Sequence, residues 1–148
     1  MKATIAELTR RSDVRAALAG YRHHLEEILA QIVAIQQVAA PTFAEKRRSA
    51  YIEAQFRALG AAEVSHDALH NVFARLPGRD AGRPPLVISA HLDTVFPATT
   101  DLTTRREGPL FFGPGIGDNS TGLAGLLVLG RTLVERALSK TVQSAYGE

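Results

Sequence analysis

A continuous, mainly apolar run, PLVISA at residues 85–90, limits the architectures open to this chain. Such a run is typical of a β-strand buried on both faces, because a half-exposed strand would alternate apolar and polar residues. Strands of that kind occur in parallel sheets whose faces are covered by helices. The run therefore predicts an α/β domain with a mostly parallel sheet.

Helical patterns flank this run on both sides. Apolar residues recur every three or four positions in three stretches, residues 5–18, 21–38 and 120–138. Thr42 and Glu45 have the spacing of a capping box, which predicts a further helix that ends at Gly60. Shorter strands are expected at residues 62–65, 71–76 and 110–112.

Composition excludes several classes of protein. The 148 residues are 45% hydrophobic, which suits one globular domain and not a disordered chain. The net charge of +2 and the lack of a basic stripe argue against a nucleic-acid partner. No run approaches the roughly 20 apolar residues of a membrane span or forms a signal-peptide core, so we expect a cytoplasmic protein with no membrane contact. Without Cys, any metal must be held by His, Asp and Glu.

His91 and Asp93 follow directly after the predicted buried strand. Residues two apart in an extended segment point to the same side, so Asp93 can reach one imidazole nitrogen of His91 while the other faces outward. A carboxylate in this position fixes the tautomer of a metal-binding histidine. Ligands also bind at the carboxyl ends of strands in open α/β sheets. Taken alone, a histidine with satisfied hydrogen bonds at a strand end is an equally good interpretation.

A glycine-rich turn, GPGIG at residues 113–117, leads into Asp118 and the last apolar helix. Its three glycines allow backbone conformations closed to other residues, so the turn can direct the Asp118 carboxylate into the same crevice. Taken alone, Asp118 or Asn119 is more simply a helix cap. The two motifs together favour a metal site.

HLDTV at residues 91–95 and GDNSTG at residues 117–122 resemble the two amino-terminal signatures of metallopeptidase family twenty, the aminoacylase, dipeptidase and tripeptidase T relatives. The resemblance implies a zinc-exopeptidase-like three-layer sandwich with a mostly parallel sheet. It also implies that His91 ligates one zinc ion of a dinuclear site, that Asp118 bridges both ions, and that Asp93 is the catalytic-site carboxylate that orients His91. Cobalt or manganese would be alternative metals.

The reaction implied by this resemblance is metal-dependent hydrolysis of an amide bond in a small peptide or N-acyl amino acid. In such enzymes a glutamate acts as general base on the metal-bound water, and the metal ions polarise the scissile carbonyl. The resemblance further implies that the full-length form is a homodimer.

The later residues of the family pattern are not securely present. After Asp118 the carboxylates are Glu135 and Glu148, and no His follows. Glu135 lies about 25 Å along the helix from Asp118, and Glu148 is a weak candidate for the general base. We therefore expect residues 1–148 to be the amino-terminal portion of a catalytic domain, truncated at the carboxyl end and inactive alone. Its leading helices would span residues 1–40 and its best-matching region residues 42–138.

Three alternatives stay open. HDALH at residues 66–70 imitates the H-E-x-x-H zinc motif, although strand-like segments flank it where that motif needs a helix. Residues 113–117 could be the phosphate loop of a nucleotide-binding domain, although Asp118 occupies the place of the third glycine. An inactive fragment or a non-enzymatic partner with the same fold would carry the same two motifs.

Overall fold

The computed structural model describes residues 4–78 and 82–146. In this part of the chain the helices are α1 (Ile5–Leu8), α2 (Ser12–His23), α3 (Leu25–Gln36), α4 (Lys46–Ala58) and α5 (Thr121–Tyr146), with a short irregular helical segment, η1 (Ile116–Ser120), before α5. The strands are β1 (Glu63–His66), β2 (Val72–Arg75), β3 (Arg105–Glu107) and β4 (Leu110–Phe112). They form two separate antiparallel hairpins, β1–β2 and β3–β4.

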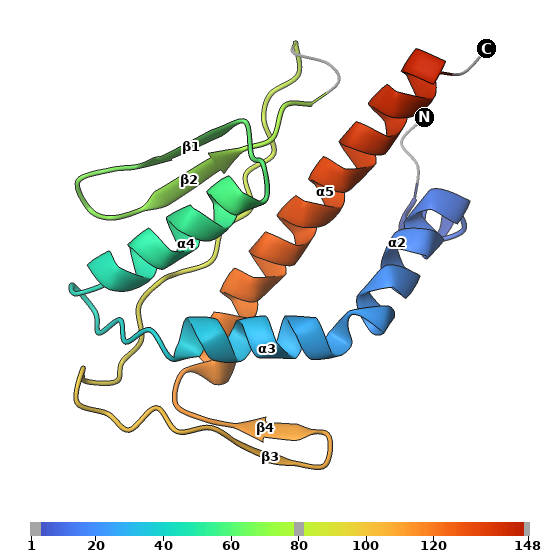
Figure 1. The fold of residues 1–148 in the computed structure, drawn as a ribbon. Helices are drawn as coiled ribbons and strands as arrows, with labels where there is room; N and C mark the ends of the chain where they lie inside the picture. Colours follow the sequence, from blue (N-terminus) through green and yellow to red (C-terminus); the bar gives the residue numbers. More distant parts are fainter. Residues whose placement is uncertain (1–3, 79–81, 147–148) are drawn as a thin grey trace.

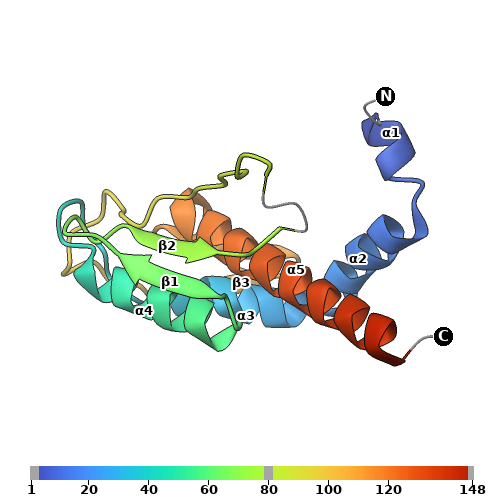
Figure 2. The ribbon, with the colours of Figure 1, turned by 90° about the horizontal axis from the view of Figure 1, so that it is seen from above.

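The core lies where α3, α4 and α5 meet (Figure 1). The buried apolar side chains come from all three helices and are Ile32, Ile35, Ile52, Leu123, Ala124 and Leu127. The β1–β2 hairpin packs on the other side of α4, whereas α1 and α2 contribute no buried residue and project away from the core (Figure 2). Three helices and one hairpin therefore enclose the hydrophobic core.

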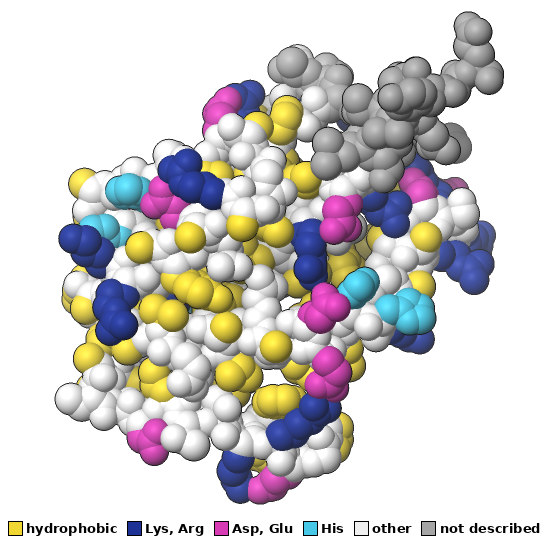
Figure 3. Space-filling model, viewed as in Figure 1, with side chains coloured by type: hydrophobic (Ala, Val, Ile, Leu, Met, Phe, Trp, Pro, Cys, Tyr) yellow, Lys and Arg dark blue, Asp and Glu magenta, His cyan; other side chains and the backbone are white. Residues whose placement is uncertain are grey.

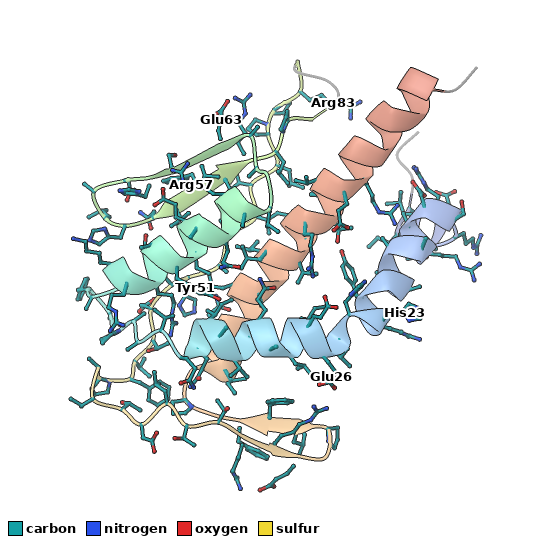
Figure 4. The ribbon with its side chains drawn as sticks, in the orientation of Figure 1. His23, Glu26, Tyr51, Arg57, Glu63 and Arg83 are labelled. Carbon is teal, nitrogen blue, oxygen red and sulfur yellow. The ribbon has the colours of Figure 1, made fainter. Side chains whose placement is uncertain are left out.

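Polar side chains tie both hairpins to the helices. From α4, the Arg57 side chain reaches the β1–β2 hairpin and donates to the carbonyl oxygen of Val64 at 3.1 Å (Figure 4). From α3, the Glu26 carboxylate points toward the β3–β4 hairpin, where it accepts two hydrogen bonds from Arg106 at 2.8 and 2.9 Å. Neither hairpin therefore depends on its own short ladder alone.

The predicted mostly parallel sheet, and with it the three-layer sandwich, is wrong. Residues 85–90 form no strand in the structure, and Leu86 and Val87 are 86% and 80% exposed. A strand is buried on both faces only when other strands and two helical layers surround it. Among the described residues no strand pairs with residues 85–90. The one parallel pairing in this part of the chain is the isolated bridge between Pro41 and Thr94. The chain is a small mixed α/β domain.

Because the predicted parallel sheet is absent from the described residues, apolar side chains are exposed on the surface. Figure 3 shows hydrophobic groups among the charged ones over much of one face. Besides Leu86 and Val87, the residue Ile88 is 53% exposed and Phe73, on β2, is 55% exposed. These positions are apolar in the sequence but lack a covering layer among the described residues.

The predicted capping box at Thr42 and Glu45 is also wrong. Helix α4 begins at Lys46, and no side chain caps its first turn by a hydrogen bond. Glu45 instead accepts from the backbone N–H of Phe43 at 2.6 Å, and the Thr42 hydroxyl donates to Asp93. Because the helix begins three residues later than the cap requires, Thr42 is not at the N-cap position, and its hydroxyl bonds the Asp93 carboxylate instead. The helices predicted over residues 21–38 and 120–138 and the strands near residues 63–66, 72–75 and 110–112 agree in outline with the structure. The single helix predicted over residues 5–18 is instead divided into α1 and α2, and Gly20, its predicted end, lies inside α2, which ends at His23.

Candidate metal centre

The segment that carries His91 and Asp93 is fixed beside the chain that links α3 to α4. Thr94 is buried, and its backbone N–H donates to the carbonyl oxygen of Ala40 at 2.8 Å. Pro41 and Thr94 form the parallel bridge at the same point. Two segments, residues 38–42 and 91–95, therefore meet at Pro41 and Thr94, next to the start of α4.

His91 and Asp93 lie on the same side of their segment and contact each other. The Nδ1 atom of His91 is 3.0 Å from Oδ1 of Asp93 and 3.1 Å from the backbone oxygen of Asp93. The other carboxylate oxygen, Oδ2, accepts the Thr42 hydroxyl at 2.7 Å. The hydrogen bond from Thr42, followed by that from His91, lowers the pKa of Asp93 despite an opposing effect of burial. Asp93 is thus an ionised acceptor held on both oxygens.

The turn that carries Asp118 is held by α3. Gln36 is fully buried at the end of that helix, and its Nε2 atom donates to the carbonyl oxygens of Leu102 and Pro114 at 3.1 and 2.9 Å. Gly115 has a φ of +72°, and a Cβ atom there would lie 3.0 Å from the Thr94 side chain. Glycine is therefore required at this position both by backbone conformation and by space.

Asp118 and His91 meet across 27 residues of sequence. Oδ1 of Asp118 lies 2.7 Å from Nε2 of His91, so the imidazole has a carboxylate at each nitrogen. The side chains of His91 and Asp118 are 50% and 86% exposed, which leaves their meeting point open to solvent. Burial opposes the charged imidazole, but the hydrogen bonds to Asp118 and Asp93 outweigh it and raise the pKa of His91.

The donor atoms at this point suit a metal ion. An imidazole Nε2 and a carboxylate oxygen are both zinc ligands, and the partner on Nδ1 is the carboxylate that metal-binding histidines commonly have. Asp93 faces Nδ1 and therefore orients His91 without reaching the Nε2 side. No group of three or more potential ligands was found among the described residues. The residues therefore fit one edge of a metal site, formed by His91 and Asp118.

Among the described residues, the structure adds no other sequence candidate to this point. Glu148 lies outside the described residues, and Glu135 is far along α5. The helical zinc motif imitated by residues 66–70 is excluded, because His66 is on strand β1 and His70 has a φ of +65°. His66 contacts Glu53 at 2.9 Å.

Sequence reasoning missed the supporting roles of three residues, Gln36, Thr42 and Arg48. Thr42 is 51 positions from Asp93, so no local spacing could reveal their contact. Arg48 lies four residues before buried Ile52 on α4 and is itself 1% exposed. Its spacing from Ile52 places Arg48 on the apolar face of the helix, and a charged residue at such a position indicates a buried side chain with hydrogen-bond partners.

Comparison with known families gives one match. The family described as Peptidase family M28 matches residues 71–145, just over half of the chain, and this range includes His91, Asp93 and Asp118. No curated protein matches the sequence. The metallopeptidase part of the resemblance is therefore confirmed, whereas the matched family is M28 and not family twenty.

Proposed function

The chain belongs to peptidase family M28, and from this premise we propose that His91 and Asp118 supply two ligands of a zinc-dependent hydrolytic site. One observation carries the proposal: His91 Nε2 and Asp118 Oδ1 are 2.7 Å apart and accessible, while Asp93 takes the other ring nitrogen. That geometry and the chemistry of the donor atoms support the proposed ligand roles.

Each of the three side chains has a separate task. Asp93 accepts a hydrogen bond from the Nδ1–H group of His91, which keeps the proton on Nδ1 and so leaves the Nε2 lone pair available on the open side. Asp118 brings a negative charge to the same point, from a turn that Gln36 holds in place. Zinc bound there would act as a Lewis acid that activates water and polarises a carbonyl group. Amide hydrolysis is the reaction that this combination serves.

The finer parts of the proposal concern substrate and assembly. We propose small peptides or N-acyl amino acids as substrates, two zinc ions in the complete site with Asp118 between them, and cobalt or manganese as substitutes. A homodimer and a cytoplasmic location stay predictions, as does the absence of a nucleic-acid partner. None of the helices in the described part of the chain has the length and apolar character to cross a membrane.

A second candidate is a chain with the same fold and no activity of its own. It is favoured by the ligand count, because among the described residues two donors meet and no cluster of three is found. Zinc sites with catalytic activity have three protein ligands, so two donors predict weak binding and no turnover. We therefore propose that residues 1–148 alone bind zinc weakly and do not hydrolyse a tripeptide.

Calorimetric titration with zinc tests the ligand assignment. His91→Ala and Asp118→Asn should each abolish measurable binding, since each removes one of two donors. His66→Ala is the matched control, because His66 is 56% exposed, similar to the 50% of His91, and contacts the carboxylate of Glu53, whereas His91 contacts two carboxylates. Equal zinc affinity in the unaltered protein and in His91→Ala would refute the assignment. Tripeptide hydrolysis by the purified chain with added zinc would refute the second candidate.

A further inference from the structure

We propose that Arg48 is a positioning residue for His91 and Asp93, an inference that rests on the metal site proposed above. The Arg48 guanidinium is buried beneath the segment that carries both residues and bonds to the backbone between them. It does not reach the donor atoms themselves. Its role is to fix the direction in which the two side chains leave the chain.

Two hydrogen bonds from the Arg48 side chain hold the two segments, residues 38–42 and 91–95, next to each other. Nη1 of Arg48 donates to the carbonyl oxygen of Leu92 at 2.8 Å, and Nε donates to the carbonyl oxygen of Val38, also at 2.8 Å. Leu92 stands between His91 and Asp93, so this bond fixes the peptide group that joins Leu92 to Asp93. Val38 begins the neighbouring segment, whose Thr42 contacts the Asp93 carboxylate. By bonding one carbonyl in each segment, Arg48 sets the distance between the two segments.

The charge of Arg48 has its counterpart at the same site. Burial lowers the pKa of Arg48, and the Asp93 carboxylate acts in the opposite direction. A buried guanidinium is costly unless it is hydrogen-bonded and compensated by an opposite charge. Arg48 meets both conditions: the carbonyl oxygens of Val38 and Leu92 accept its hydrogen bonds, and the Asp93 carboxylate supplies the opposite charge.

Lysine cannot replace this arrangement fully. The guanidinium is a planar group whose Nε and Nη1 atoms donate in two fixed directions, whereas an ammonium is a point charge on a flexible stem. Arg48→Lys therefore keeps the charge but holds at most one of the two carbonyls well. Arg48→Met removes both the charge and the hydrogen bonds.

The neighbouring residue provides a matched control. Ser49 is 4% exposed on the same turn of α4, and its hydroxyl donates to the carbonyl oxygen of His70 at 2.7 Å. Ser49→Ala thus removes a buried side-chain bond to the turn between β1 and β2. Any general loosening of α4 would affect both variants, whereas misplacement of His91 is expected only for Arg48.

The test combines two measurements on the full chain, with folding checked by circular dichroism. In the metal-free protein at fixed pH, the unaltered chain and Ser49→Ala should show the hydrogen-bonded Nδ1 proton of His91 by NMR, and Arg48→Met should lose it. Zinc calorimetry should show affinity lowered about tenfold or more in Arg48→Met, by an intermediate factor in Arg48→Lys, and hardly at all in Ser49→Ala.

Two results would overturn the proposal. One is a folded Arg48→Met variant with an unchanged Nδ1 signal and unchanged zinc affinity. If that variant does not fold, Arg48→Lys decides in the same way, because it too must show a weakened signal and weakened binding. Failure of the unaltered chain to bind zinc would instead count against the proposed function, and the Nδ1 signal would still decide the role of Arg48.

Discussion

The hydroxyl of Thr42 donates to the Asp93 carboxylate at 2.7 Å, a contact between residues 51 positions apart. It completes a chain of hydrogen bonds that runs from Thr42 through Asp93 and His91 to Asp118. Each member restricts the rotation of the next. The direction in which His91 faces is thus set from both sides of its ring.

Replacing Thr42 by Val should raise the pKa of Asp93 toward its ordinary value, because the bond from Thr42 is the largest cause of its lowered pKa. Carboxyl carbon NMR of the metal-free protein measures this directly. Thr103→Val is the matched control, since Thr103 bonds Asp101 at 2.6 Å and lowers that pKa in the same way. The control should raise the pKa of Asp101 and leave Asp93 unchanged. An unmoved Asp93 in Thr42→Val would contradict the hydrogen-bond chain.

Replacing Gln36 by Leu should destabilise the fold by about 1–3 kcal/mol, because it leaves the carbonyl of Pro114 without its buried donor. Urea unfolding followed by circular dichroism measures the change in free energy of unfolding. Gln37→Leu is the control, because Gln37 is exposed and its bond to Leu102 duplicates one made by Gln36. Gln37 also donates to Oε1 of Gln36 at 2.8 Å, but its removal leaves both bonds donated by Gln36 in place, so the loss should be smaller. Equal losses in the two variants would show that the turn before Asp118 does not depend on Gln36.

The stability of the α4–β1 contact should depend on pH through Glu53. Its carboxylate accepts from Arg57 at 2.6 Å and from His66 at 2.9 Å, and the bond from Arg57 is the largest cause of its lowered pKa. A carboxyl group with a lowered folded pKa stabilises the fold above its unfolded pKa, near 4.5, and this stabilisation is lost as pH falls through the folded pKa.

Unfolding curves at neutral and at acidic pH check this expectation. Glu53→Gln should be less stable than the unaltered chain at pH near 7, and the difference should vanish at acidic pH. Arg57→Met should reproduce more of the loss than His66→Ala, in keeping with the order of the two contacts. A difference that persists unchanged into acid would show that the ionised carboxylate is not its source.

Exposed apolar residues at positions 86–88 should promote self-association. The double substitution Leu86→Lys with Val87→Thr should shift the sedimentation profile toward the monomer, because it removes two of the most exposed apolar side chains. Its free energy of unfolding should change by less than about 0.5 kcal/mol, as expected for side chains with few contacts. Leu133→Lys, at a position 49% exposed on α5, is the control. An unchanged profile in the double variant would contradict the role of this segment.

Local sequence patterns predicted the elements that depend on local interactions. The apolar spacing over residues 21–38 and 120–138 reflects burial of one helix face, and α3 and α5 indeed supply most of the core. The predicted strand at residues 85–90 failed because a strand depends on neighbours that the pattern cannot display. The capping box failed for a similar reason, since Asp93 is a partner that no spacing near Thr42 reveals.

Part of the candidate site could be predicted from the sequence, because some of its residues have side chains that suit a metal ion. His91, Asp93 and Asp118 were singled out because their residue types and flanking glycines suit a metal, and the structure brings all three together. Arg48 and Gln36 were missed, because they act through backbone carbonyls whose positions depend on the fold. Residues that carry chemistry are thus more visible in a sequence than those that position them.

Nitrogen-15 NMR of His91 during zinc addition tests the central claim most directly. Zinc at the point between His91 and Asp118 should shift the resonance of Nε2 strongly, while Nδ1 keeps its proton and its bond to Asp93. Asp118→Asn should abolish that shift over the same range of zinc concentrations. Zinc that leaves the Nε2 resonance unmoved, or that binds through Nδ1, would contradict the account.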